Sequence, residues 1–154
     1  MIQRAEGHLS AAGAVYAAAW QASHRDVVRA ETLARYTPAY GARYLQGLAD
    51  RGCQIYVLNG PLPQGVLALD PERRRVELLY VAPAHWGRGV GSCLLAFALH
   101  TLGPGPVTLT VLNQNSRARR FYEARGFACT GEEIILSAQR GLSELTYRHE
   151  GVAP

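Results

Sequence analysis

The sequence predicts a mixed α+β fold (α/β in the broad sense), in which one central sheet carries helices on both faces. Hydrophobic periodicity gives the element order β α α β β β α β α β β along 154 residues. Three short strands follow one another in the middle of the chain, which predicts antiparallel hairpins. A strand–helix–strand unit comes after them and should be parallel and right-handed. The length favours a single domain over residues 1–154.

The first part of the chain contains one short strand and two helical regions. Residues 1–5 fit the strand, and apolar residues recur at helical spacing over Leu9–Trp20. A second helical region covers about 31–50. Within it, Thr37 precedes a proline, a pair that caps and restarts a helix, and Gly52 ends the region.

Three strands with clear turns between them occupy the middle of the chain. They are expected at Cys53–Leu58, Gly65–Leu69 and Arg75–Val81. The turns between them are Asn59-Gly60-Pro61 and Asp70-Pro71-Glu72, whose glycine and proline residues interrupt extended structure. The three strands are therefore expected to pair as consecutive hairpins.

The last third of the chain alternates helices and strands. We expect a helix over 89–102, a strand over 107–112, a helix over 116–125 and strands over 127–136 and 142–149. Gly103 and Pro104 end the first of these helices, and Gly126 ends the second.

Every basic residue in the sequence is arginine, and lysine is absent. This excludes a Schiff-base lysine, a phosphate-loop lysine and the strand lysine of protein kinases. The 16 arginines outnumber 12 acidic residues, and the resulting charge of +4 favours anionic partners. Because the arginines are scattered along the chain, no nucleic-acid partner is expected.

Cysteine usage and hydropathy bear on the compartment. Cys53, Cys93 and Cys129 form no C-x-x-C pair, so neither a disulfide framework nor a zinc site is expected, and the histidines show no metal-ligand spacing. A reducing, cytoplasmic location follows as the expectation. The apolar run Leu9–Trp20 is short and alanine-rich, which favours a helix of the domain over a signal peptide, and no membrane span is expected.

The most informative stretch is 79–91, which runs from the end of a strand through a proline to a glycine-rich turn and a helix. The first N–H groups of a helix have no partners within it, and the helix dipole adds partial positive charge. Glycine at positions 87, 89 and 91 lets a ligand approach the backbone, and Arg88 adds a guanidinium. The stretch therefore predicts a pyrophosphate site.

Two alternatives to that site differ in strength. The first alternative, a glycine-rich turn that binds no ligand, is not excluded by the sequence. The dinucleotide fingerprint G-x-G-x-x-G fails, because Ser92 or Leu94 stands at its last position and no acidic residue follows at the required distance.

Residues 79–91 resemble the acetyl-coenzyme A signature of the GCN5-related N-acetyltransferase (GNAT) superfamily, strand–P-x-x-(Gln/Arg)-G-x-G-x-G/A–helix. A second block, Asn115–Phe127, resembles the N-x-x-A-x-x-(F/L)-Y-x-x-x-G-F that follows the fifth strand of the family. The blocks occur in the family's order, and the clear resemblance covers about 75–127. Trp86 departs from the pattern, which usually has glutamine or arginine there. Since that position contributes mainly backbone to the phosphates, binding should survive, with Arg88 carrying more of the charge.

The resemblance implies a mostly antiparallel sheet of about seven strands whose fourth and fifth strands splay apart. It implies acetyl-coenzyme A (acetyl-CoA) as co-substrate, no metal, and a pantetheine arm paired with the exposed edge of the fourth strand. The residues it assigns to cofactor binding are Leu79, Tyr80, Val81, Trp86, Gly87, Arg88, Gly89, Val90, Gly91, Ser92, Asn115 and Tyr122.

The resemblance also implies direct attack of an amine on the thioester, helped by an acid and a base. Tyr122 matches the family's tyrosine and would protonate the departing thiolate. Glu77, on the face of the fourth strand that also carries Leu79 and Val81, is either the base or the partner of an arginine such as Arg75. Asn115 is either a plain helix cap or a cap that also touches the cofactor. Thr110 stands where some relatives have a glutamate, so no base is expected from the fifth strand.

The resulting expectation is an N-acetyltransferase that acts on a primary amine of a small molecule or peptide. A transferase for another acyl group and a non-catalytic acyl-CoA sensor are the alternatives. A homodimer is compatible with the family, whereas no membrane partner is expected.

Some chemically active residues are expected to have structural roles. Cys93 should be a small buried residue, and His85 either touches phosphate or is solvated. The arginines between 117 and 125 should form a solvated helix face from which one or two could reach the 3′-phosphate. The family's acceptor site is capped by the helical region that holds His24, Tyr36, Tyr40 and Tyr44.

Overall fold

The computed structural model describes residues 1–59 and 62–154. It contains a seven-stranded sheet in the order β1-β2-β3-β4-β5-β7-β6, and every neighbouring pair is antiparallel except β4 and β5. The predicted fold class and parallel unit are therefore confirmed, and the element order differs in one place: the helical region expected over 31–50 is two helices, Ala30–Ala34 and Pro38–Asp50, divided at the Thr37–Pro38 restart. Of the turn expected at 59–61, residues 60 and 61 lie outside the described residues.

The elements lie close to their expected places. The strands are β1 (Ile2–Arg4), β2 (Gln54–Leu58), β3 (Gly65–Asp70), β4 (Arg75–Val81), β5 (Pro104–Leu112), β6 (Ala128–Ser137) and β7 (Leu142–Gly151). The helices are α1 (Leu9–His24), α2 (Ala30–Ala34), α3 (Pro38–Asp50), α4 (Val90–Leu102) and α5 (Ser116–Glu123), with a 3₁₀ turn over Pro83–His85. Thr37 caps α3 as predicted, since its Oγ1 accepts a hydrogen bond from the N–H of Tyr40.

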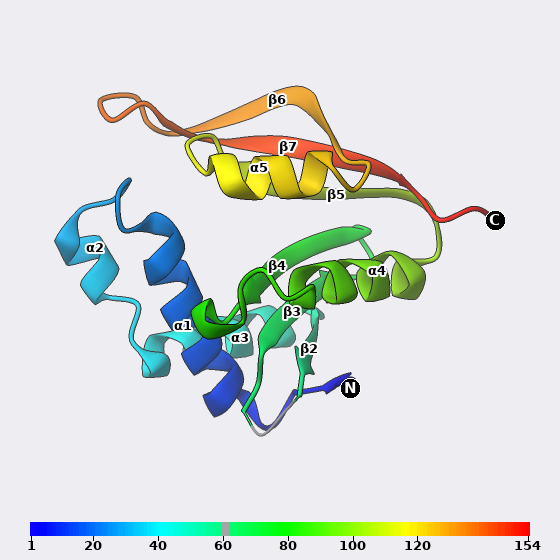
Figure 1. Ribbon diagram of the computed structural model, residues 1–154, viewed down its shortest axis with the longest axis horizontal. Helices are drawn as coiled ribbons and strands as arrows, with labels where there is room; N and C mark the ends of the chain where they lie inside the picture. The colour runs from blue at the N-terminus through cyan, green and yellow to red at the C-terminus, as the bar shows by residue number, and fades with distance from the viewer. Residues whose placement is uncertain (60–61) are drawn as a thin grey trace.

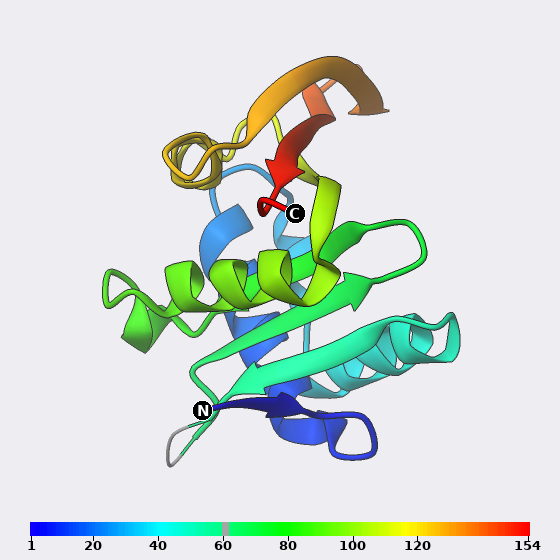
Figure 2. The same ribbon diagram turned by 90° about the vertical axis from the view of Figure 1, so that its right-hand side faces the viewer.

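Helices cover both faces of the sheet (Figures 1 and 2), which separates the interior into two apolar layers. On one face, α1 and α3 pack against β2, β3 and the second half of β4, with Leu45 and Ile55 fully buried. On the other, α4 and α5 pack over β3 to β7, with Leu94 and Tyr147 fully buried. Helices α1 and α3 touch through their backbones at Gly13 and Gly41, where any Cβ would meet main-chain atoms of the other helix.

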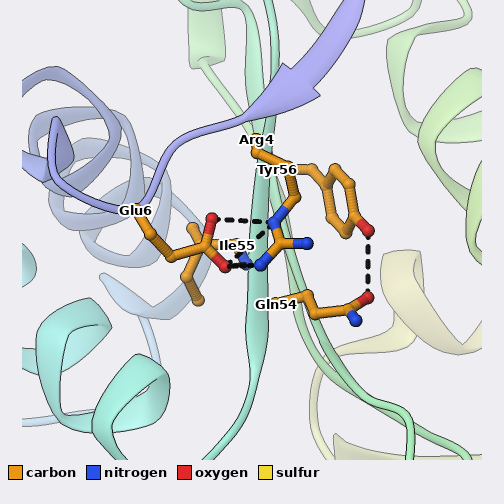
Figure 3. A network of polar contacts seen from close by, with 5 residues as sticks. All are labelled: Arg4, Glu6, Gln54, Ile55 and Tyr56. Atoms are coloured by element: carbon orange, nitrogen blue, oxygen red, sulfur yellow. Dashed lines mark hydrogen bonds and ion pairs between the residues drawn. The ribbon is translucent and has the colours of Figure 1, made fainter.

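A polar cluster joins β1 to its neighbour β2 (Figure 3). The guanidinium of Arg4 donates to both carboxylate oxygens of Glu6, and the backbone N–H of Ile55 donates to Glu6 Oε1 over 3.1 Å. Burial alone would raise the pKa of Glu6, but these hydrogen bonds outweigh it and hold that pKa below its ordinary value. The short first strand is thus held by charge as well as by backbone pairing.

The expectation that Cys93 is buried is wrong. Helix α4 buries a stripe at helical spacing that includes Val90, Leu94 and Ala98, and Cys93 falls outside that stripe. The thiol is exposed.

Arg74 holds the end of α4 against the loop before β5. Its guanidinium donates to four backbone carbonyls: Nε to Pro106 over 2.9 Å, Nη1 to Leu102 over 2.6 Å, and Nη2 to Gly103 and Gly105 over 2.8 and 3.0 Å. The last carbonyls of a helix lack partners within it, so one side chain satisfies groups that would otherwise need water. Arg74 itself has a positive φ of 54°, which is uncommon for a residue with a Cβ.

Among the described residues, no helix is long and apolar enough to cross a membrane.

Candidate active site

Strands β4 and β5 separate almost as soon as they meet. Their only ladder pair is Arg75 with Thr108, next to a hydrogen bond from the N–H of Thr108 to the carbonyl of Arg74. Further along, Leu79 and Val81 pair with β3 on one side but have no strand partner on the β5 side within the described chain. The expected splay is therefore present, and it leaves backbone groups of β4 open to a ligand.

The glycine-rich turn after β4 places the beginning of α4 at this opening. Gly87 and Gly89 have φ values of 75° and 83°, a left-handed conformation in which glycine avoids the strain of a Cβ. Gly89 directly precedes α4. A Cβ at Gly91 would lie 3.2 Å from the ring of Phe121 on α5, so glycine keeps the passage between the two helices open.

A cavity of about 580 Å³ lies between the opening of β4, the first turn of α4 and helix α5. The residues lining it include eleven of the twelve predicted cofactor residues: Leu79, Tyr80, Val81, Trp86, Gly87, Gly89, Val90, Gly91, Ser92, Asn115 and Tyr122. The stretch 79–91 and the block beginning at Asn115 thus meet at one site, although 23 residues lie between Gly91 and Asn115.

Arg88 is the predicted residue that does not line this cavity; its neighbours do, and its side chain is exposed. Two arginines of the α5 region line it instead, Arg117 and Arg125. Arg125 donates to Ser92 Oγ from both Nε and Nη2, over 2.9 and 2.6 Å. The positive charge beside the first turn of α4 therefore comes from α5 and the residues just after it.

The sequence had suggested that the α5 arginines form a solvated face, but they do not all do so. Arg119 donates to the Tyr147 hydroxyl over 3.0 Å and to the Asn113 carbonyl over 3.1 Å, so it supports the sheet. Arg120 is exposed, as expected. His85 lines the cavity instead of being fully solvated.

Trp86, which departs from the family pattern, braces the turn. Its indole N–H donates to the carbonyl of Val81 over 2.8 Å, which ties the turn back to the end of β4. The Val81 carbonyl already has this partner, whereas the carbonyl of Leu79, two residues earlier on the same edge, has none on the β5 side among the described residues.

Tyr122 lies where two cavities meet. Its side chain is only 8% exposed and lines both the large cavity and a second one of about 100 Å³. The hydroxyl forms no hydrogen bond with any described residue and is not sealed from solvent space, so it is open to the cavities. Burial raises the pKa of this phenol well above its ordinary value, which keeps it protonated. Phe121 beside it packs against its ring, with centroids 5.1 Å apart.

Asn115 caps a helix and also lies at the cavities. Its Oδ1 accepts a hydrogen bond from the N–H of Ala118 over 3.1 Å, which caps α5, and the residue lines both cavities.

Glu77 is paired with the predicted arginine and also lines the second cavity. Arg75 Nε lies 3.0 Å from Glu77 Oε1, and Arg75 Nη2 donates to Thr110 Oγ1 over 3.1 Å. Thr110 in turn donates to Glu144 Oε2 over 2.7 Å, which brings a carboxylate of β7 to the splay. Sequence reasoning missed Glu144, because the pairing of β5 with β7 is a tertiary feature without a local signal.

Aromatic rings from α1, the region around α3 and β4 form a continuous cluster, of which His24 and Tyr80 line this second cavity. Trp20 stacks between His24 and Tyr36 with ring centroids 4.0 and 3.6 Å apart. Tyr16 contacts Tyr36, Tyr44 and Tyr80, and Tyr40 contacts Tyr36 and Tyr44. Burial lowers the pKa of His24, so its ring is neutral near pH 7.

No group of three or more histidine, cysteine or acidic side chains over 1–59 and 62–154 is arranged to hold a metal ion.

Comparison with curated proteins gives two relatives of related activity. A probable N-acetyltransferase of Mycobacterium tuberculosis is 32% identical over 106 residues, which cover 65% of this chain and 61% of that protein. Peptidyl-lysine N-acetyltransferase YjaB of Salmonella typhimurium is 39% identical over 81 residues, 53% of each protein. The chain therefore spans about half to three-fifths of the length of these curated relatives.

Solved structures share the fold over nearly the whole chain. The PaiA N-acetyltransferase of Thermoplasma acidophilum, solved in complex with coenzyme A, superposes with a TM-score of 0.78 at 18% identity and covers 97% of this chain and 98% of its own. A family model described as the acetyltransferase (GNAT) domain matches residues 51–129, which is just over half of the chain and contains both motif blocks. The chain belongs to the GNAT family of acetyltransferases.

Proposed function

We propose that the protein is an acetyl-CoA-dependent N-acetyltransferase that acts as a single domain on a primary amine. One observation carries the proposal: the large cavity joins the first turn of α4 to the open edge of β4 and ends at the free hydroxyl of Tyr122. A second cavity continues from that hydroxyl to Glu77. The arrangement offers one place for an acyl thioester and another for its attacker.

The residues of the large cavity fit the chemistry of coenzyme A. Free N–H groups at the beginning of α4 suit a pyrophosphate, and Arg117 and Arg125 add charge for phosphate oxygens. The open backbone of Leu79 and the N–H of Val81 suit the amide groups of a pantetheine arm, which would pair as an added strand. The cavity volume of about 580 Å³ is in the usual range for a small-molecule site.

The transfer would proceed by direct attack. The amine nitrogen forms a bond to the acetyl carbon, and the bond from that carbon to sulfur breaks with its electron pair going to sulfur. Glu77 takes one proton from the incoming ammonium and passes it to solvent. Tyr122 gives its proton to the sulfur and regains one from the nitrogen as the amide forms. The balance is an ammonium and a thioester giving an amide, a thiol and one proton.

The acceptor in this proposal is a small molecule or a peptide that carries a primary amine. The name of the Salmonella relative supports a lysine side chain as one such amine. The chain itself has no lysine, so its own side chains do not compete as acceptors.

The test combines cofactor binding with release of free thiol from acetyl-CoA. Tyr122→Phe should keep acetyl-CoA affinity within about twofold and lower turnover by about 100-fold, since a positioned proton donor contributes about that much. Tyr56→Phe is the matched control, because Tyr56 is equally buried but its hydroxyl bonds to Gln54 on β2. Binding without thiol release from any acceptor would instead favour an acyl-CoA sensor.

A further inference from the structure

The C-terminal end of α1 reaches both cavities. Ala22 and Ser23 line the large cavity, and His24, the last residue of the helix, lines the second one. Glu77 and Tyr122 line the second cavity as well. The mechanism proposed above gives these two side chains the protons of the reacting amine, so a third polar side chain borders the space in which that amine would react.

The hydrogen bond that His24 makes decides which of its ring nitrogens is free. Nδ1 lies 2.9 Å from the carbonyl oxygen of Trp20, one helical turn earlier. Because a carbonyl oxygen can only accept, Nδ1 carries the proton, and Nε2 of the neutral ring then carries none. Burial lowers the pKa of His24, which keeps the ring neutral near pH 7. His24 therefore offers an unshared electron pair at Nε2.

The Nε2 atom of His24 is accessible but has no partner. The side chain is only 7% exposed, and its one hydrogen bond to a described residue is the bond at Nδ1. Within the described chain no sealed polar side-chain atom lacks a partner, so Nε2 is not sealed in the interior and is open at the second cavity. The ring of Trp20 stacks on the imidazole at 4.0 Å and 4°, which restricts its rotation. A hydrogen-bond acceptor is thus held in one orientation at this cavity.

The proposed acetyl transfer uses only two of the three hydrogens of an ammonium group. Glu77 takes one before the attack, and Tyr122 regains one as the amide forms, so the third stays on the nitrogen of the product. Rotation about the carbon–nitrogen bond of the acceptor is free unless this remaining N–H has a partner. Only one orientation aims the lone pair of the nitrogen at the acetyl carbon. A group that binds the third hydrogen would therefore fix the direction of attack.

We propose that His24 is a further catalytic residue, whose Nε2 accepts a hydrogen bond from the N–H that stays on the acceptor nitrogen. This inference rests on the acetyl transfer proposed above and adds a residue of α1 to it. The nitrogen gains positive charge as it attacks, so its N–H becomes a stronger donor and the contact with His24 strengthens in the transition state. His24 takes up no proton, and the balance of atoms stays as given for Glu77 and Tyr122.

Two substitutions distinguish the roles of the two ring nitrogens. His24→Asn retains an amide N–H near the position of Nδ1, which can bond to the Trp20 carbonyl, but has no atom at the position of Nε2. His24→Gln places an amide oxygen near the position of Nε2. We expect His24→Asn to lower kcat by about 50-fold with KM changed by less than about threefold, and His24→Gln to stay within about fivefold of the parent. If His24 only held the Trp20 carbonyl, the asparagine variant would be the more active of the two.

The assay measures thiol release from acetyl-CoA with three primary amines: Nα-acetyl-lysine amide, glycinamide and benzylamine. The variants are compared on the amine that the parent uses best. His149→Asn is the matched control, because Nδ1 of His149 also bonds to backbone, at the N–H of Gly151, but His149 lines neither cavity. Acetyl-CoA affinity should be equal in all variants, since His24 does not line the large cavity. Urea unfolding shows whether each variant is folded.

The possible results separate this inference from the proposed function. Equal turnover in the parent and His24→Asn, or a more active asparagine than glutamine variant, would overturn the role of His24 and leave acetyl transfer standing. If His24→Asn does not fold, the glutamine variant decides alone, and a loss of more than about tenfold in its kcat overturns the inference. No thiol release by the parent with any of the three amines would overturn both.

Discussion

The guanidinium of Arg117 lies over the indole ring of Trp86, with its Cζ 4.2 Å from the ring centroid. The hydrogen bond from the indole N–H to the Val81 carbonyl fixes the position of this ring. A tryptophan at a position where the family usually has glutamine or arginine thus holds an arginine of α5 beside the large cavity. The substitution moves the charge to another element instead of removing it.

Arg117→Ala is expected to weaken acetyl-CoA binding about tenfold, since a charge-assisted hydrogen bond contributes about 1.5 kcal/mol. Calorimetric titration measures this, and the same titration with dephospho-coenzyme A shows whether the 3′-phosphate is the group bound. Arg120→Ala is the control, an exposed arginine of the same helix that does not line the cavity. Arg88→Ala should change affinity by less than about twofold; a larger loss there would show that Arg88 moves into the site on binding.

Gly91→Ala is expected to weaken acetyl-CoA binding more than it affects folding. Its Cβ would lie 3.2 Å from the Phe121 ring, where it narrows the cavity between α4 and α5. Gly47→Ala is the control within a helix, since a Cβ there meets nothing within 4 Å and should stabilise the fold by about 0.5–1 kcal/mol. Urea unfolding and titration of each variant separate the two effects. Unchanged affinity in Gly91→Ala would exclude this passage as the cofactor path.

Arg74→Ala is expected to lower the free energy of unfolding by about 2–3 kcal/mol, because four carbonyls lose a charged donor. Arg74→Gly should lose about 1 kcal/mol less, since glycine adopts the positive φ of this position without strain. Arg73→Ala is the neighbouring control; its side chain is 78% exposed and reaches only Asp70, at 3.8 Å. Equal losses from Arg73 and Arg74 would contradict the structural role assigned to Arg74.

The Glu6 cluster predicts a dependence of stability on acid. Because the folded pKa of Glu6 is lowered, the carboxylate stabilises the protein above its ordinary pKa of about 4.3, and this contribution is lost as pH falls through the lowered value. Urea unfolding between pH 3 and pH 6 should therefore show a smaller loss of stability in Glu6→Gln than in the parent. The control is Glu150→Gln, since the Glu150 side chain is 80% exposed; its stability should change with pH as that of the parent does.

Glu77→Gln distinguishes a Glu77 that acts as the catalytic base from a Glu77 that only forms an ion pair with Arg75. If Glu77 accepts the proton, turnover should fall about 100-fold at neutral pH and recover toward pH 10, where an amine of pKa near about 10.4 loses its proton unaided. A structural role alone would lower the rate by the same factor at every pH. Tyr122 stays protonated over this range, so it adds no decline of its own.

Local patterns in the sequence were sufficient for much of the fold. Strand β4 occupies the predicted residues, and the capping role of Thr37 follows from its place before Pro38. The glycine spacing around Gly89 pointed to the turn that lines the large cavity, because helix termini and turns depend on neighbouring residues.

The rest depends on contacts that no local pattern encodes. The register between β5 and β7 brings Glu144 to Thr110, and the fold of the turn decides that Arg117, not Arg88, lines the cavity. Cys93 was misjudged because residue type alone says nothing about which side of α4 meets the sheet.

Among the described residues a single ladder pair, Arg75 with Thr108, joins β4 to β5, so the sheet consists of two half-sheets. A ligand that binds along the open edge of β4 would bridge the two half-sheets. Its binding free energy should therefore stabilise them against separating from each other. Amide hydrogens of both half-sheets should then exchange more slowly when coenzyme A is bound, including amides far from any atom it touches.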